Sequence, residues 1–182
     1  MIRQASIYSL KQLPPCDRAA YGQRVLTTRF WLRGVSRQDV DYWLPDAGPS
    51  AHLLRALRSG QVSPETALVR YEDEQRYQRA CRVVHYEEGQ CTCDQVVAYS
   101  PLHVLRQLER EHGTITLLCW EPEPSPCHRH RLRALLLEGT PCALHPGQAR
   151  AVWLGGEPLC VRCAIAELQR RHHHQNSVHV SH

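Results

Sequence analysis

The sequence predicts an α/β domain with a layered, mostly parallel sheet and flanking helices, followed by a small C-terminal zinc-binding module. Strand-like and helix-like segments alternate through the first two-thirds of the chain, which is typical of α/β domains. A short apolar run at 115–119 leads through three prolines into a helix-like segment. Cysteine and histidine pairs after residue 139 have the spacing of structural zinc ligands.

The composition is that of a globular protein. Hydrophobic residues make up 42% of the 182 residues, and no apolar run approaches the roughly 20 residues of a membrane span. The first residues lack the apolar core and cleavage site of a signal peptide. We therefore expect a soluble, cytoplasmic protein whose nine cysteines serve metal or thiol chemistry rather than disulfides. The net charge of +4 permits contact with nucleic acid and does not by itself indicate it.

Four strand regions are predicted, at residues 2–8, 24–31, 82–99 (as a hairpin insertion) and 115–119. Arg29 and Arg33 lie at or just past the end of the second region, which in a parallel sheet is the side that binds ligands. They are candidate anion-binding residues. The alternative is that both arginines pair with surface acids such as Asp39 and Asp41.

Four helices are predicted, at residues 51–59, 64–81, 101–112 and 126–138. Each follows a serine that can act as an N-cap, and three of the four have proline at the first helical position. The charged run Glu72–Glu74 in the second helix is typical of a solvated surface.

The hairpin insertion contains a possible second metal site. His85, Cys91 and Cys93 are ligand types, but one C-x-C pair with one histidine is a weak pattern. An exposed, polar hairpin tip around GQCTCD is the simpler interpretation.

The segment 115–137 is the main candidate for chemistry. Its strand ends at Cys119, and Cys127 and His128 fall in the first turn of the following helix. The positive end of a helix dipole favours anions and thiolates, so we predict an anion pocket with a reactive thiol. In this hypothesis Cys127 or Cys119 is the thiolate, and Glu121 or His128 transfers protons.

The anion itself would be held by three arginines, Arg29, Arg33 and Arg129. Two alternatives remain open. Cys127 can instead be a small core residue beside a solvated helix face, or Cys119 and Cys127 can form a redox-sensitive pair or a second metal site.

Two separated motifs resemble a known family. The pattern LLCWEPEPSPCHRHRL is similar to the "LLC-x-E … CHR-x-x-L" signature of bacterial domain-of-unknown-function family 488. The stretch from Arg29 to Leu53 is similar to the family's "R-x-W-x-R-G … W … PS-x-x-L" block, and Tyr71 with Glu74 to its "Y-x-x-E" helix. The resemblance covers roughly residues 1–138 and implies an α/β fold more than an activity.

Residues 139–171 are predicted to form a zinc-binding module. A C-x-x-H pair and a C-x-x-C pair are separated by 14 residues, and the segment between them has the pattern of a short hairpin turning at Gly155-Gly156. The four predicted Zn²⁺ ligands are Cys142, His145, Cys160 and Cys163. Four protein ligands leave no open position, so this ion would be structural, as in the treble-clef and zinc-ribbon modules that the segment resembles. The polar tail, 172–182, is predicted to be disordered.

Two functions follow from these patterns. The first is an enzyme acting on a phosphorylated or otherwise anionic small molecule through a thiol. The alternative is a nucleic-acid-binding or adaptor protein that uses the zinc module and the basic tail. The sequence does not indicate the oligomeric state.

Overall fold

The computed structural model describes residues 1–122, 127–138, 152–154 and 157–159. The chain divides into two compact units, Met1–Leu136 and Leu137–His182. The strands are β1 (Ile2–Ser6), β2 (Gln23–Leu26), β3 (Tyr42–Trp43), β4 (Cys81–Glu87), β5 (Gln90–Val97), β6 (Ile115–Cys119), β7 (Val152–Leu154) and β8 (Glu157–Leu159). The α-helices are α1 (Ile7–Lys11), α2 (Pro15–Ala19), α3 (Ala51–Arg58), α4 (Pro64–Tyr77), α5 (Pro101–His112) and α6 (His128–Leu137). Among these residues no helix is both long and apolar enough to cross a membrane.

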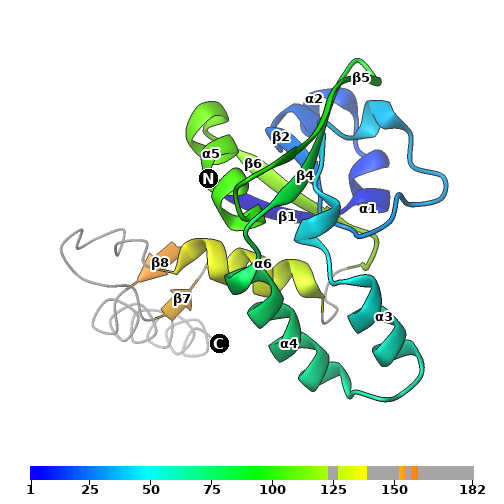
Figure 1. Cartoon of the computed structure of the whole chain (residues 1–182). Helices are drawn as coiled ribbons and strands as arrows, with labels where there is room; N and C mark the ends of the chain where they lie inside the picture. Colours follow the sequence, from blue (N-terminus) through cyan, green and yellow to red (C-terminus); the bar gives the residue numbers. More distant parts are fainter. Residues whose placement is uncertain (123–126, 139–151, 155–156, 160–182) are drawn as a thin grey trace, which may run out of the picture. The chain divides into compact units, whose positions relative to one another are not determined.

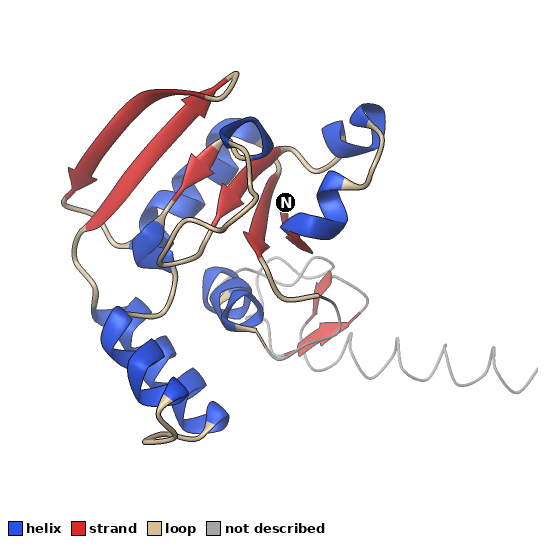
Figure 2. Cartoon of the chain, turned by 90° about the vertical axis from the view of Figure 1, so that its right-hand side faces the viewer, coloured by secondary structure: helices blue, strands red, loops and turns tan. Residues whose placement is uncertain are grey.

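A six-stranded sheet forms the centre of the first unit, in the order β1-β6-β2-β3-β4-β5 (Figure 1). The first four strands of this order are parallel, and β4 and β5 are antiparallel to their neighbours. The predicted α/β class is confirmed, and three of the five strand pairs in the sheet are parallel. The two antiparallel pairs arise because the hairpin extends the same sheet beyond β3, as Figure 2 shows at its long outer strands.

The buried strand β6 was predicted correctly. All five of its residues are buried, because it lies between β1 and β2 and is covered on both faces. Leu118 of this strand belongs to a core cluster that includes Ile7, Leu26 and Val84. The C-terminal end of this central strand carries Cys119.

Several predicted boundaries were wrong. The first strand ends at Ser6, where α1 begins, and β2 ends at Leu26 instead of residue 31. Just after β2, the backbone N–H and the hydroxyl of Thr27 both donate to the carbonyl of Leu118 on β6, and the hydroxyl of Thr28 donates to the carbonyl of Phe30. Helix α4 ends at Tyr77, and Cys81 belongs to β4.

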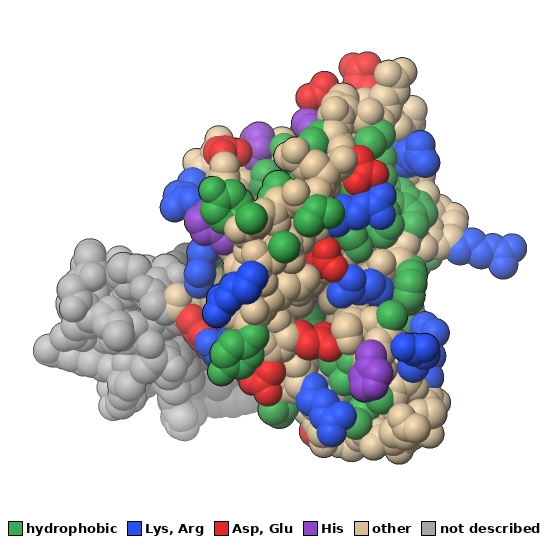
Figure 3. Space-filling model, viewed as in Figure 1, with side chains coloured by type: hydrophobic (Ala, Val, Ile, Leu, Met, Phe, Trp, Pro, Cys, Tyr) green, Lys and Arg blue, Asp and Glu red, His purple; other side chains and the backbone are tan. Residues whose placement is uncertain are grey.

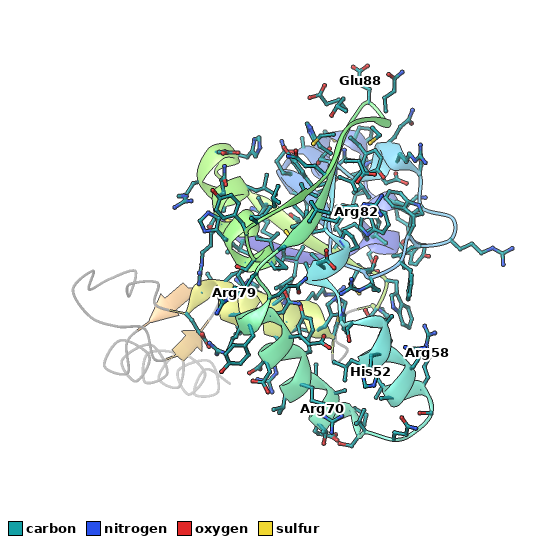
Figure 4. The ribbon with its side chains drawn as sticks, viewed as in Figure 1. His52, Arg58, Arg70, Arg79, Arg82 and Glu88 are labelled. Carbon is teal, nitrogen blue, oxygen red and sulfur yellow. The ribbon has the colours of Figure 1, made fainter. Side chains whose placement is uncertain are left out.

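The hairpin was predicted correctly, but its tip was not. The turn residues are Glu88 and Gly89, with φ of 51° and 82°, a combination that suits a tight hairpin turn. Cys91 and Cys93 therefore lie within β5. Figure 4 shows Glu88 at the far end of the hairpin and Arg82 on β4.

In the second unit, β7 and β8 form an antiparallel pair, in agreement with the predicted short hairpin. All four predicted zinc ligands of this segment, and the tail 172–182, lie outside the described residues.

Helices α3 and α4 are held together at their ends by a carboxylate that the sequence pattern had assigned to a solvated surface. Glu74 accepts hydrogen bonds from the Ser50 hydroxyl at 2.5 Å and from its backbone N–H at 2.9 Å. The same hydroxyl accepts from the N–H of Leu53 at 3.1 Å, so Ser50 caps α3 and is fixed by α4. The two helices lie as a pair beside the sheet (Figure 1).

Replacing Ser50 by alanine is expected to destabilise the protein by about 1–2 kcal/mol, because both the cap and the contact with Glu74 are lost. Urea unfolding measures the change. The matched control is Ser63→Ala, which removes an exposed cap of α4 and should cost about 0.5–1 kcal/mol. A Ser50 cost no larger than the Ser63 cost would contradict this role.

Candidate functional site

A cluster of two cysteines, one glutamate and one histidine lies at the C-terminal end of β6. We call it the Cys–Glu–Cys–His cluster; its members are Cys119, Glu121, Cys127 and His128. Their ligand-type atoms all lie within 4.8 Å of one another. The first two come from the end of β6 and the residues just after it, and the last two from the start of α6. The chain thus brings together all four residues that were predicted to be catalytic.

The distances within the cluster are short. The Oε2 atom of Glu121 lies 2.5 Å from Cys119 Sγ and 3.1 Å from Cys127 Sγ. His128 Nδ1 lies 3.9 Å from the first sulfur and 3.7 Å from the second. Both thiols are free and buried, whereas the Glu121 side chain is partly exposed.

A main-chain carbonyl orients the His128 ring. Its Nε2 lies 2.7 Å from the carbonyl oxygen of Thr27, which can only accept, so Nε2 carries the hydrogen. In the neutral ring, Nδ1 then presents a lone pair to the two sulfurs. Tyr71 packs edge-on against the same ring with centroids 5.5 Å apart, and its hydroxyl donates to the carbonyl of Ala47 at 2.7 Å.

Arg129 fixes the chain on either side of the cluster. Its side chain is fully buried, and Nη1 donates to the carbonyl of Ala5 at 3.1 Å and to that of Glu121 at 2.9 Å. It thereby ties β1 and the segment after β6 to the first turn of α6. Arg129 is a positioning residue for the backbone that carries Glu121.

The cluster favours one thiolate and one thiol. The hydrogen bond from Cys119, opposed by burial and reinforced by His128, lowers the pKa of Cys127 to about 3. The same hydrogen bond, together with burial, raises the pKa of Cys119. Burial raises the pKa of Glu121. Burial lowers the pKa of His128, but the interaction with Cys127 outweighs it and the net shift is upward.

A cavity of about 130 Å³ opens beside the cluster. Glu121, Cys127 and His128 contribute to its wall. The rest of the lining comes from the α3–α4 region, namely Pro49, Leu53, Leu54, Leu57, Pro64, Ala67, Leu68 and Tyr71. On their outer faces the two helices carry the exposed residues His52, Arg58 and Arg70 (Figure 4). The cavity therefore joins a polar, sulfur-containing wall to an apolar one.

The three predicted anion ligands are placed differently from the cluster. Arg29 is paired with Asp46 at 2.5 Å and donates to the carbonyl of Pro49, so its partner is neither of the two acids considered from the sequence. Arg33 is exposed. None of the three arginines, Arg29, Arg33 and Arg129, is among the described residues that line the cavity. Their role in holding an anion stays a prediction.

The three residues of the candidate second metal site on the hairpin, His85, Cys91 and Cys93, make contacts with protein groups near them. Cys91 Sγ lies 3.5 Å from the carbonyl oxygen of Cys93, and the hydroxyl of Thr92 lies 3.0 Å from His85 Nδ1. The ring of His85 stacks on Tyr42 with centroids 4.4 Å apart.

Two supporting positions were missed from the sequence. Thr27 acts through its main-chain carbonyl, which leaves no trace in the residue type, and Gly48 packs directly against the backbone of 27–29. The sequence shows a glycine after a proline-containing turn at this position, but it does not show that the backbone of 27–29 packs against it.

Together, the fold and the cluster define an α/β protein with two buried sulfurs, a buried imidazole and a partly exposed carboxylate at the C-terminal end of a parallel strand. The chain belongs to the DUF488-N3a family, described as the active DUF488-N3 subclade, whose sequence model matches residues 7–140. This confirms the resemblance seen in the two motifs. No curated protein and no solved structure gives a match.

Proposed function

We propose that the protein is an enzyme in which Cys127 is the nucleophile for a substrate held in the α3–α4 cavity. One observation carries this proposal: the three chemically active groups on the cavity wall, from Glu121, Cys127 and His128, face an otherwise apolar lining. A pocket with a few convergent polar groups in apolar surroundings is the usual form of a small-molecule site. The family description as an active subclade agrees with an enzymatic role.

The geometry suits thiol chemistry. His128 Nδ1 lies 3.7 Å from Cys127 Sγ, within the looser range seen for nucleophile–base pairs before substrate binds. Glu121 Oε2, at 3.1 Å from the same sulfur, can exchange a proton with the substrate or its leaving group. Thr27 and Tyr71 hold the imidazole in place. They supply the group that orients the base, which is the third part of a nucleophile–base site.

The apolar lining supports a substrate that inserts an uncharged group. The cavity, at about 130 Å³, admits part of a small molecule. The predicted anion ligands are not among the described residues of the lining, so the lining itself supplies no guanidinium for a phosphate. The candidate substrates are therefore small molecules with an apolar reactive end, with or without an anionic group.

Site-resolved alkylation tests this proposal. Reduced protein is treated with iodoacetamide in the presence of a chelator, and each cysteine is followed by mass spectrometry. Cys127 should react at least about tenfold faster than the buried Cys81, and His128→Gln should slow Cys127 without changing Cys81, because the imidazole that helps to stabilise the Cys127 thiolate is lost. The exposed Cys16 reports on general thiol reactivity. Reaction of Cys127 no faster than Cys81 would remove the nucleophilic role.

The same experiment separates the two substrate features. Protection of Cys127 by a small apolar alcohol supports occupancy of the cavity by an uncharged group. Protection by inorganic phosphate, lost in Arg33→Ala, supports the predicted anion site.

The alternative function and the C-terminal zinc module remain proposals. The zinc ligands and the basic tail that motivate nucleic-acid binding lie outside the described residues. On the face shown in Figure 3, acidic and basic side chains are interspersed. Binding to single-stranded or double-stranded nucleic acid that weakens steeply with salt would support the alternative.

A further inference from the structure

We infer that the Cys–Glu–Cys–His cluster is a metal site that binds one Zn²⁺ ion. This inference goes beyond the proposed function, because metal binding does not require Cys127 to act as a nucleophile. It also differs from the predicted C-terminal zinc site, with which it shares no residue.

Three of the four short donor–donor distances in the cluster are close to those of a tetrahedral zinc site. Zn–S bonds of about 2.3 Å and Zn–N or Zn–O bonds of about 2.0–2.1 Å place neighbouring ligand atoms roughly 3.6 Å apart. In the cluster the Cys127 Sγ–Glu121 Oε2 distance is 3.1 Å, and the two sulfur–Nδ1 distances are 3.7 and 3.9 Å. The Cys119 Sγ–Glu121 Oε2 distance of 2.5 Å has to widen by about 1 Å, which the partly exposed Glu121 side chain can accommodate.

The histidine is prepared as a metal ligand. A ligating imidazole usually donates its second N–H to a carbonyl or carboxylate, which fixes the ring orientation. His128 does this through Nε2 to Thr27, at 2.7 Å, so that Nδ1 faces the sulfurs. The supporting carbonyl is itself held, because the Thr27 side chain donates to the carbonyl of Leu118 on β6.

The donor set selects the ion. Thiolate and imidazole ligands suit Zn²⁺, whereas Mg²⁺ and Ca²⁺ prefer oxygen ligands. A coordinated thiol loses its proton to solvent on binding, and a divalent cation offsets the negative charge of the buried sulfurs and the carboxylate.

The exposure of the ligands distinguishes their roles. Cys119 and Cys127 are 0% and 4% exposed and His128 is 9% exposed, so these three form the fixed part of the site. Glu121 is partly exposed and lines the cavity, which makes it the ligand that a bound molecule can replace. Three fixed ligands with one exchangeable position are typical of catalytic zinc.

Metal content tests the inference directly. Full-length protein is reduced, incubated with excess ZnCl₂, desalted and analysed for zinc per chain by mass spectrometry. Cys119→Ser is compared with wild type, and the Cys119→Ser/Cys160→Ser double variant with Cys160→Ser. Each comparison should show a loss of one zinc per chain, whereas Cys16→Ser, at an exposed thiol, should show none. Equal zinc in both pairs overturns the site.

Two further variants guard against a folding artefact. His128→Gln should also lose one zinc, and Glu121→Gln should keep it with at least about tenfold weaker affinity, each with the far-ultraviolet circular dichroism of wild type. In cobalt-loaded protein, absorption typical of tetrahedral thiolate coordination should fall in Cys127→Ser. Unchanged zinc content in a folded His128→Gln protein would also overturn the inference. Zinc loss is independent of alkylation in chelator, so the site and the nucleophile can fail separately.

Discussion

Replacing Arg129 by methionine is expected to destabilise the protein by about 3 kcal/mol. The guanidinium is fully buried and donates to the carbonyls of Ala5 and Glu121. Methionine fills much of the same volume but offers no donor, so both carbonyls lose a charge-assisted hydrogen bond in a place that water cannot reach. The connection between β1, the segment after β6 and α6 is lost with them.

Urea unfolding measures this loss, and the same helix offers a matched control. Arg131 is also an arginine of α6, but it is exposed and pairs with Glu72 at 3.2 Å. Arg131→Met should cost no more than about 0.5 kcal/mol, because exposed ion pairs contribute little. If the two variants differed by less than about 1 kcal/mol, Arg129 would not be the support that its contacts indicate.

Replacing Gly48 by alanine is expected to cost about 3 kcal/mol and to weaken the cluster. A Cβ atom at this position would lie 2.5 Å from the backbone nitrogen of Arg29 and 3.0 Å from the carbonyl oxygen of Thr27. The backbone angles, φ −88° and ψ 162°, are accessible to alanine, so the cost is a steric clash with the neighbouring chain. The clash moves the same Thr27 carbonyl that orients His128.

The control for Gly48 is Gly60→Ala. Gly60 has φ of +72° and open space around its Cβ position. Alanine there should lower the free energy of unfolding by only about 1 kcal/mol, the cost of a left-handed backbone conformation. Thermal unfolding and zinc content are measured on both variants. The Gly60 variant should keep its zinc, and the Gly48 variant should bind it more weakly. A Gly48 variant as stable as the Gly60 variant would show that the two backbones can separate without cost.

The zinc-site proposal and the nucleophile proposal both involve the Cys–Glu–Cys–His cluster, but they require different roles of its two sulfurs. Zinc binding needs the sulfurs of both Cys119 and Cys127 as ligands, whereas in the nucleophilic proposal Cys127 reacts and Cys119 only donates a hydrogen bond to it. In Cys119→Ser the serine hydroxyl can still donate that hydrogen bond, so loss of zinc with retained Cys127 reactivity in this variant supports both proposals.

The local elements could be predicted because their signals are local. Ser50, Ser63 and Ser100 each cap the helix that follows, as expected from a serine before a helical pattern. The central buried strand, the hairpin and the helix that begins at His128 follow from apolar periodicity and from turn residues a few positions away. The ends of strands were predicted less well, because they depend on hydrogen bonds with strands that are distant in the sequence, such as those from Thr27 to Leu118.

The sequence by itself determined the residue types of the site and the order of the strand and helix that carry them, since both depend on neighbours in the chain. Only the tertiary structure decided which of those residues meet. It joined Cys119 to Cys127 and His128, supplied a carbonyl from 101 positions earlier to orient the imidazole, and paired Arg29 with Asp46. The physical reason is that these contacts depend on the order of strands in the sheet and on main-chain groups, which are common to all residue types.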